Sequence, residues 1–265
     1  MKQLKFKFVV ASSLIYGFGS IPKSNYMIRH PEKYSEEVCH RRAVKIMRHM
    51  KLKAMTRTKC YGLDNLPKEG GYIMYSNHQG KYDALGILIK HKPTCAVLWE
   101  AKSADRLLAR QICGLLRAKT IEFDNPRQQI KVLNEIAEEV ADGRRYLIFP
   151  EGGYTNNKNN LQEFKHGCFT CSLKSKTPII PVVLYDSWKS MDINTIRPVT
   201  TQVHFLEPIY YEEYGHMKKK EISDMVKGLI QQRIDDIKSG EFKKQLKLKK
   251  IIIVRQKERR YLTLL

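Results

Sequence analysis

A histidine and an aspartate five positions apart, His78 and Asp83, are the residues of this sequence best placed to do chemistry. They lie in the stretch YIMYSNHQGKYDALG, residues 72–86, which reads as a short apolar strand, a polar turn and the start of a helix. Such a bend lets the Asp83 carboxylate fold back onto one ring nitrogen of His78, fix its tautomer and leave the other nitrogen as a general base. We expect this base to deprotonate a substrate hydroxyl directly. The alternative is that His78 packs or caps the turn and Asp83 only favours a helix N-terminus.

A second polar loop, FPEGGYT over residues 149–155, follows the apolar segment YLIF. A strand that ends in this way places the Glu151 carboxylate and the backbone amides of Gly152 and Gly153 at the carboxyl edge of a sheet, where open α/β sheets bind ligands. Glycines at such a position let backbone N–H groups approach an anion closely. The alternative is an ordinary turn with an exposed glutamate.

Three sequence blocks, NHQGKYD, FPEGGYT and IIPVVL, occur in an order and at spacings that resemble the glycerolipid acyltransferase family, and within it the bacterial enzymes that acylate 1-acyl-glycerol-3-phosphate. The resemblance extends from Tyr61 to Pro208. It implies that His78, assisted by Asp83, is the catalytic base of an acyltransferase. The implied reaction transfers a fatty acyl group from acyl-CoA or an acylated acyl carrier protein to the sn-2 hydroxyl, giving phosphatidic acid. Because a thioester is already activated, no metal ion or organic cofactor is implied.

The same resemblance implies where the acceptor binds. The FPEG block and basic residues in neighbouring segments would hold the glycerol phosphate, and backbone amides of the glycine loop are candidate donors to the oxyanion. Lys102 matches a lysine that lies near the phosphate in the family, with a solvated surface lysine as the alternative. Lys165 lies in FKHG, which resembles a recurrent F-K-x-G segment. The substrate-binding residues expected in this way are Asn77, Lys102, Arg127, Glu151, Gly152, Gly153 and Lys165.

The chain departs from the family at two arginines. Where the family commonly has an arginine that binds phosphate after FPEG, this sequence has Tyr154, and where it has a second arginine, after the strand expected over residues 121–123, this sequence has Asp124 and Asn125. Tyrosine cannot replace a bidentate cation at a phosphate. Another lysophospholipid or an alcohol is therefore an alternative acceptor. The basic residues close in sequence that could compensate are Arg127, Lys165 and His166.

The formal net charge of +21 over 265 residues indicates a polyanionic partner. Nucleic acid, an anionic membrane surface and phosphorylated substrates all fit this charge. No nucleic-acid-binding module is recognisable, and the basic residues cluster at the chain ends beside apolar runs, which favours lipid. We therefore expect an anionic membrane surface, and no nucleic acid, as the partner. A catalytically inactive membrane scaffold is a third class, against which the intact His78–Asp83 pair argues.

The N-terminal segment carries Lys2, Lys5 and Lys7 ahead of an apolar run over residues 8–21. This run is shorter than the roughly 20 residues that a spanning helix needs. A secretory signal is the competing interpretation, but basic residues on both sides favour keeping both flanks in the cytoplasm. We expect a re-entrant or interfacial anchor at the cytoplasmic face of the cell membrane. A basic amphipathic helix over about 32–57 would follow it in the headgroup layer, with a surface helix of the globular domain as the alternative.

Alternating apolar strands and amphipathic helices predict an α/β fold, with a mostly parallel sheet flanked by helices and preceded by N-terminal membrane-associated helices. Residues 1–57 are expected to anchor the chain, residues 58–240 to form the acyltransferase domain, and residues 241–265 to form a basic tail. The six cysteines are expected to be reduced core thiols. Strands are expected over 72–75, 96–99, 121–123, 146–149, 179–184 and 202–206, and helices over 83–90, 104–117, 126–142, 167–174 and 218–237.

Overall fold

One seven-stranded sheet organises the part of the chain that the structure describes, a computed structural model covering residues 4–17, 20–106 and 108–248. The strand order is β1-β7-β6-β2-β5-β3-β4, and every neighbouring pair is parallel except β6 and β7. The predicted fold class, a mostly parallel α/β sheet flanked by helices, is therefore confirmed. The strands are β1 (Thr56–Tyr61), β2 (Tyr72–Ser76), β3 (Ala96–Glu100), β4 (Lys119–Ile121), β5 (Arg145–Ile148), β6 (Ile179–Tyr185) and β7 (Val199–Phe205).

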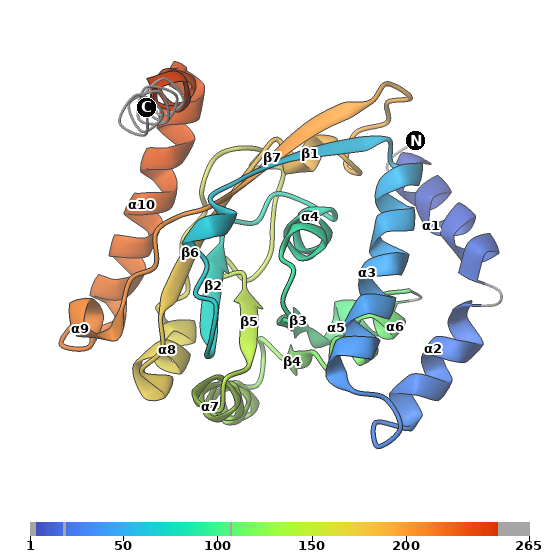
Figure 1. The fold of residues 1–265 in the computed structure, drawn as a ribbon, viewed down its shortest axis with the longest axis horizontal. Coiled ribbons are helices and arrows are strands. Elements are labelled where there is room, and N and C mark those ends of the chain that lie inside the picture. The colour runs from blue at the N-terminus through green and yellow to red at the C-terminus, as the bar shows by residue number, and fades with distance from the viewer. Residues whose placement is uncertain (1–3, 18–19, 107, 249–265) are drawn as a thin grey trace, which may run out of the picture.

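Helices cover both faces of the sheet, so the molecule has three layers (Figure 1). The main helices are α1 (Leu4–Gly17), α2 (Ser20–Arg29), α3 (Glu36–Lys53), α4 (Asp83–Lys90), α6 (Ala109–Leu115), α7 (Pro126–Ala141), α8 (Thr170–Ser175) and α10 (Lys219–Ser239). Short helices are α5 (Ala101–Ala104) and α9 (Tyr211–Tyr214), with 3-10 turns η1 (Leu63–Asn65), η2 (His166–Phe169) and η3 (Ser187–Lys189).

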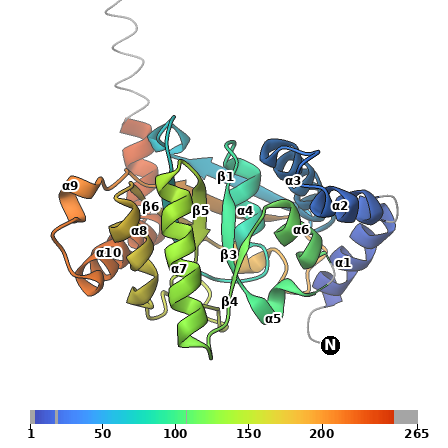
Figure 2. The same cartoon turned by 90° about the horizontal axis from the view of Figure 1, so that it is seen from below.

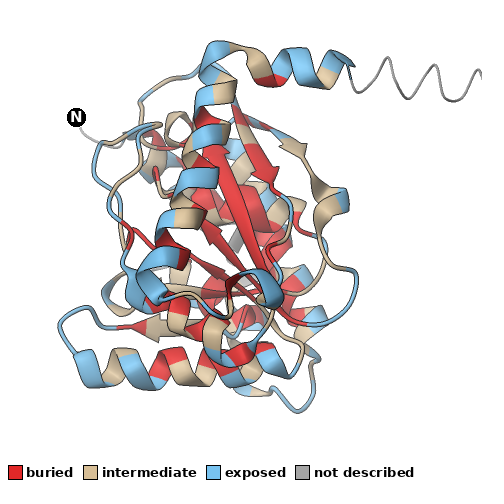
Figure 3. Ribbon diagram, turned by 90° about the vertical axis from the view of Figure 1, so that its left-hand side faces the viewer, coloured by how far each residue is buried: buried red, intermediate tan, exposed pale blue. Residues whose placement is uncertain are grey.

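The central strand β2 shows how the sequence fills two apolar cores. Successive side chains of a strand point to opposite faces. Tyr72 and Met74 accordingly join the cluster under α3, α4 and α6, whereas Ile73 and Tyr75 join the cluster under α7, α8 and α10. All four are fully buried. The uninterrupted apolar pattern of this strand thus reflects a sheet covered on both sides, as Figure 3 shows by the buried strands between the helices.

The N-terminal helices pack on the globular core. The α3 stripe Cys39, Ala43, Ile46, Met47 and Met50 is buried in the same cluster as α4 and α6. The interpretation of this stripe as lying in a headgroup layer is therefore wrong, and the alternative of a surface helix with a solvated cationic face holds. Figure 2 shows α1, α2 and α3 grouped beside α6 at one end of the molecule.

Pro22 lies in the first turn of α2, where its missing N–H costs no helical hydrogen bond, so the helix continues through it. The apolar run is thus divided between α1 and α2, with residues 18 and 19 outside the described residues. Among the described helices, none combines the length and the apolar character needed to cross a membrane.

Local expectations held at most elements and failed at a few. Asn125 caps α7 by accepting from the Gln128 N–H, and Gly240 ends α10 in the left-handed conformation. The helix expected over residues 104–117 is broken instead, and Leu108 has a φ of 68° between α5 and α6. The first strand, β1, was missed because its paired partner β7 lies far away in sequence. Ile130 of α7 and Leu229 of α10 are exposed apolar side chains.

The other end of the chain is only partly described. Residues 241–248 of the predicted basic tail are helical, and the apolar segment 251–254 lies outside the described residues. All six cysteines are free, and five of them are buried, as expected for core thiols.

Candidate active site

The two chemically promising loops meet because their strands are neighbours. Strands β2 and β5 are parallel, with Tyr72 opposite Arg145 and Tyr75 opposite Ile148. Carboxyl ends of parallel neighbours lie at the same edge of a sheet. The loop that carries His78 and the loop that carries Glu151 therefore leave the sheet side by side.

His78 and Asp83 form the predicted pair. The His78 Nδ1 atom lies 2.6 Å from Asp83 Oδ2, and the Asp83 side chain is fully buried. The same Oδ2 accepts the backbone N–H groups of Gln79 at 2.5 Å and Gly80 at 2.9 Å. Because an ionised carboxylate only accepts hydrogen bonds, the shared hydrogen belongs to Nδ1, and Nε2 is left with a lone pair. The geometry supports a general base and excludes the interpretation of Asp83 as a helix-terminus charge alone.

Residues of the second loop hold the backbone of His78 from both sides. The His78 N–H donates to Glu151 Oε1 at 3.1 Å, and Asn157 Nδ2 donates to the His78 carbonyl at 3.0 Å. Gln162 Nε2 donates to the other Glu151 oxygen at 2.6 Å. Burial raises the pKa of Glu151, while the hydrogen bonds from Gln162 and the His78 N–H oppose that rise by favouring the carboxylate. Glu151 is thus a buried positioning group, not the exposed turn residue of the alternative.

His78 lines a cavity of about 530 Å³ at this edge of the sheet. Its ring stacks on Phe149, with centroids 4.3 Å apart, and meets the edge of Tyr154 at 4.7 Å. One part of the wall is apolar and comes from three layers of the fold. That part includes Phe6, Val10, Met50, Leu85, Val97, Trp99, Leu108, Ile112 and Leu133.

The glycine loop and Lys165 line the same cavity, as expected. The Lys165 ammonium lies 3.8 Å from the centroid of the Phe123 ring, and it forms no ion pair with any carboxylate in the described part of the chain. Gly152 has a φ of 71°, and a Cβ there would lie 2.6 Å from Lys165 Nζ. The left-handed backbone conformation therefore favours glycine at residue 152, and any side chain there would have to displace the end of Lys165.

Four expected substrate-binding residues do not line the cavity: Glu151, which holds the His78 backbone as described above, and the three that follow. Asn77 is buried, and its amide bridges the backbone N–H and carbonyl of Leu184, so it ties the loop to β6. Lys102 is exposed and pairs with Asp124 at 3.2 Å. Arg127 is exposed at the start of α7. The expectation that these three contact a substrate is not supported by their positions.

Two cations of the cavity wall, Lys81 and Arg106, were not singled out from the sequence. Lys81 lies between His78 and Asp83, and that position alone could have drawn attention to it. Arg106 could not have been found, because the break between α5 and α6 that places it was not expected.

The sequence is similar to a known protein family and to several named relatives. Residues 57–185 match a family model described as Acyltransferase. Relatives named 1-acyl-sn-glycerol-3-phosphate acyltransferase include the mouse alpha form, 27% identical over 171 residues (63% of this chain, 60% of that protein). The Saccharomyces cerevisiae protein is 30% identical over 196 residues (71% and 62%). The Salmonella typhimurium protein is 22% identical over 169 residues (63% and 69%).

A solved structure shares the fold. The crystal structure of the 1-acyl-sn-glycerophosphate (LPA) acyltransferase from Thermotoga maritima superposes with a TM-score of 0.69 at 19% identity, covering 89% of this chain and 95% of that one. This chain spans about 60% of the length of the mammalian relative that it matches. Residues 57–185, which carry the His78–Asp83 pair at the carboxyl edge of the sheet, match the acyltransferase family.

Proposed function

We propose that the protein transfers a fatty acyl group from an acyl thioester to the sn-2 hydroxyl of 1-acyl-glycerol-3-phosphate, giving phosphatidic acid. The observation that carries the proposal is the His78–Asp83 pair on the wall of a cavity that has both an apolar lining and cationic side chains. The printed names of the relatives support the same acceptor. The donor is acyl-CoA or an acylated acyl carrier protein, since both present the same thioester.

The chemistry follows from the two nitrogens of His78. Nε2 accepts the proton of the acceptor hydroxyl as its oxygen attacks the thioester carbonyl, and the imidazolium that forms is stabilised by Asp83 at Nδ1. The tetrahedral intermediate then collapses, the carbon–sulfur bond breaks, and the imidazolium returns the proton to the departing thiolate. Backbone hydrogen bonds at both ends of the His78 residue keep the ring in place throughout.

Lys165 is the cation that we assign to the acceptor phosphate. Lys81 also lines the cavity, but its ammonium is paired with Asp192 at 2.5 Å. Lys165 has no such carboxylate among the described residues and lies against the glycine loop. One ammonium gives a point charge where a guanidinium would give a bidentate clamp. Tyr154 in the wall therefore favours, as a second candidate, an acceptor with a different lysophospholipid headgroup.

We further propose that the N-terminal helices lie on the cytoplasmic face of an anionic membrane. Leu4 and Phe8 of α1 and Leu52 of α3 are exposed apolar side chains, and exposed Lys7 and Lys53 flank them. Apolar contact supplemented by attraction to anionic lipids is typical of interfacial helices. Liposome binding that survives raised salt would support this placement, because binding to nucleic-acid phosphates falls steeply with salt.

Thiol release from a long-chain acyl thioester tests the reaction. It would be measured with and without 1-acyl-glycerol-3-phosphate, for the native chain and for His78→Ala. We expect release that needs both the acceptor and His78. Release only with a different lysophospholipid would keep the mechanism and change the acceptor. Acceptor-dependent release that persists in His78→Ala would refute the base, and no release with any acceptor would favour a non-catalytic membrane protein.

A further inference from the structure

Asp192, from the turn after η3, reaches the loop that joins His78 to Asp83. Its Oδ2 accepts the backbone N–H of Lys81 at 3.1 Å, and its Oδ1 lies 2.5 Å from the Lys81 ammonium. Both side chains are largely buried, at 19% and 13% exposure. The backbone N–H of Asp192 donates to Trp188, which fixes the turn from which the carboxylate projects.

Gly80 has no side chain, and the Asp192 carboxylate occupies the space that a side chain there would fill. A Cβ at residue 80 would lie 2.2 Å from Asp192 Oδ2 and 3.0 Å from Asp192 Cγ, far inside van der Waals contact. The φ of Gly80 is not positive, so its backbone conformation does not require glycine. The reason for glycine at this position is the close approach of Asp192.

Two carboxylates thus accept hydrogen bonds from three consecutive backbone N–H groups of one short loop. From inside the loop, Asp83 accepts from Gln79 and Gly80, and from outside it, Asp192 accepts from Lys81. The same Asp83 oxygen pairs with His78, so any shift of the loop alters the orientation of the base.

We propose that Asp192 is a positioning residue of the catalytic loop, and that Gly80 and Asp192 act as one unit. The activity measurements that test this proposal rest on the acyl transfer proposed above. Asp192 also neutralises the Lys81 ammonium on the cavity wall, and this leaves the acceptor phosphate to the cations that have no carboxylate partner there.

A double-mutant cycle in the full-length protein tests the unit. We expect Asp192→Ala and Gly80→Ser each to lower kcat between about 10- and 100-fold, with the KM for the acyl thioester within about twofold, because orientation and not substrate binding is lost. Gly80→Ser combined with Asp192→Ala should be no worse than Asp192→Ala alone, because the serine Cβ then meets no carboxylate. Losses that multiply would overturn the proposal.

Two further variants separate positioning from charge and from folding. Asp192→Asn retains an oxygen that accepts the Lys81 N–H, so we expect it to recover most of the kcat lost in Asp192→Ala. Asp224→Ala is the matched control, because Asp224 pairs with Lys220 at 2.8 Å on the exposed face of α10 and should leave kcat unchanged. A kcat of Asp192→Asn as low as that of Asp192→Ala would overturn the role assigned to the hydrogen bond.

Nitrogen NMR of histidine-labelled protein gives a readout that needs no substrate. In the native chain, we expect His78 to show a single tautomer with the hydrogen on Nδ1, and in Asp192→Ala a mixture of tautomers. An unchanged His78 signal would refute the positioning role even if acyl transfer is established. Conversely, a changed signal in a protein without transferase activity would keep the positioning role and reject only the proposed reaction.

Discussion

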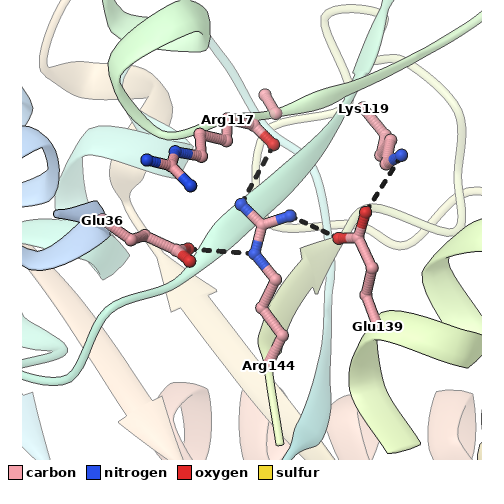
Figure 4. A pocket seen from close by; sticks show the side chains of 6 residues that line it. Glu36, Arg117, Lys119, Glu139 and Arg144 are labelled. Atoms are coloured by element: carbon pink, nitrogen blue, oxygen red, sulfur yellow. Dashed lines mark hydrogen bonds and ion pairs between the residues drawn. The ribbon is translucent and has the colours of Figure 1, made fainter. Parts of the chain in front are cut away.

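The two edges of the sheet carry pockets of comparable size and opposite character. The cavity at the carboxyl edge has a volume of about 530 Å³, and a pocket of about 440 Å³ lies at the amino ends of β4 and β5. Figure 4 shows the second pocket, where Arg144 reaches Glu36 and Glu139 and Lys119 also reaches Glu139. The lysine pairs with Glu135 as well, at 2.7 Å.

The difference lies in how the charged groups are used. At the amino edge, the Arg144 guanidinium also donates to the carbonyls of Leu116 and Arg117, so it links α3, α7 and the end of α6. Its donors are directed at protein acceptors, which is typical of structural ion pairs. At the carboxyl edge, the His78 ring has a hydrogen-bond partner among the described residues only at Nδ1, and Lys165 lies against an aromatic ring. Polar side chains that still have hydrogen-bonding atoms without a protein partner mark the edge where a substrate can be bound.

His78→Ala should have the largest effect and should act on catalysis only. We expect kcat to fall by about 10²–10⁴-fold, the usual contribution of a general base. The protein should stay folded, because His78 belongs to neither apolar cluster. Steady-state thiol release and thermal unfolding measure the two quantities. A loss of activity below tenfold would remove the contrast between the two edges.

Arg144→Met should have the opposite effect, lowering the stability of the fold and leaving catalysis unchanged. It leaves Glu36 and Glu139 without their shared cation in a half-buried setting, and we expect the free energy of unfolding to fall by about 2 kcal/mol. Activity per folded molecule should not change. Urea unfolding measures the free energy of unfolding. Arg41→Met is the control, because Arg41 forms an exposed pair with Glu37 that contributes about 0.5 kcal/mol or less. Equal stability of the two variants would contradict the structural role.

Lys165→Met tests the cation assigned to the acceptor. Loss of one charge-assisted hydrogen bond should raise the KM for 1-acyl-glycerol-3-phosphate by about tenfold or more. Lys102→Met is the matched control, because Lys102 is exposed and paired with Asp124 outside the cavity, and its KM should stay at the native value. If instead Lys102→Met raises the KM and Lys165→Met does not, the original expectation for Lys102 is restored.

Acid should destabilise the fold through two buried histidines outside the His78–Asp83 pair. Burial lowers the pKa of His91 and of His204 to about 3, below the ordinary value of 6.5. At a pH between these two pKa values, each histidine is protonated in the unfolded chain but neutral in the folded chain. The free energy of unfolding therefore falls as the pH falls, by up to about 1.4 kcal/mol per pH unit for each histidine. Thermal unfolding between about pH 5 and 6.5 should show a shallower slope for His204→Phe. An identical slope would mean that His204 is protonated in the fold.

Local patterns in the sequence were enough to predict most elements near the site. The prediction that α4 begins at Asp83 is confirmed, because a helix start and a periodic apolar face are written in neighbouring residues. The amino-edge pocket was not predicted at all, because its charges come from three separate segments. The role of Asn77 was also missed, since its partner Leu184 belongs to a strand more than 100 positions away.

The sequence by itself indicated six of the seven strands, most of the helices between them and the His78–Asp83 pair, because each of these depends on residues close together in the chain. The alternation of strands and helices in turn indicated the α/β fold class. Tertiary structure alone decided that α3 packs on the core, that Lys165 lies in the cavity while Lys102 does not, and that Asp192 meets Gly80. These contacts depend on which strands become neighbours in the sheet. That choice is made by the packing of both apolar faces together and is not visible in any single segment.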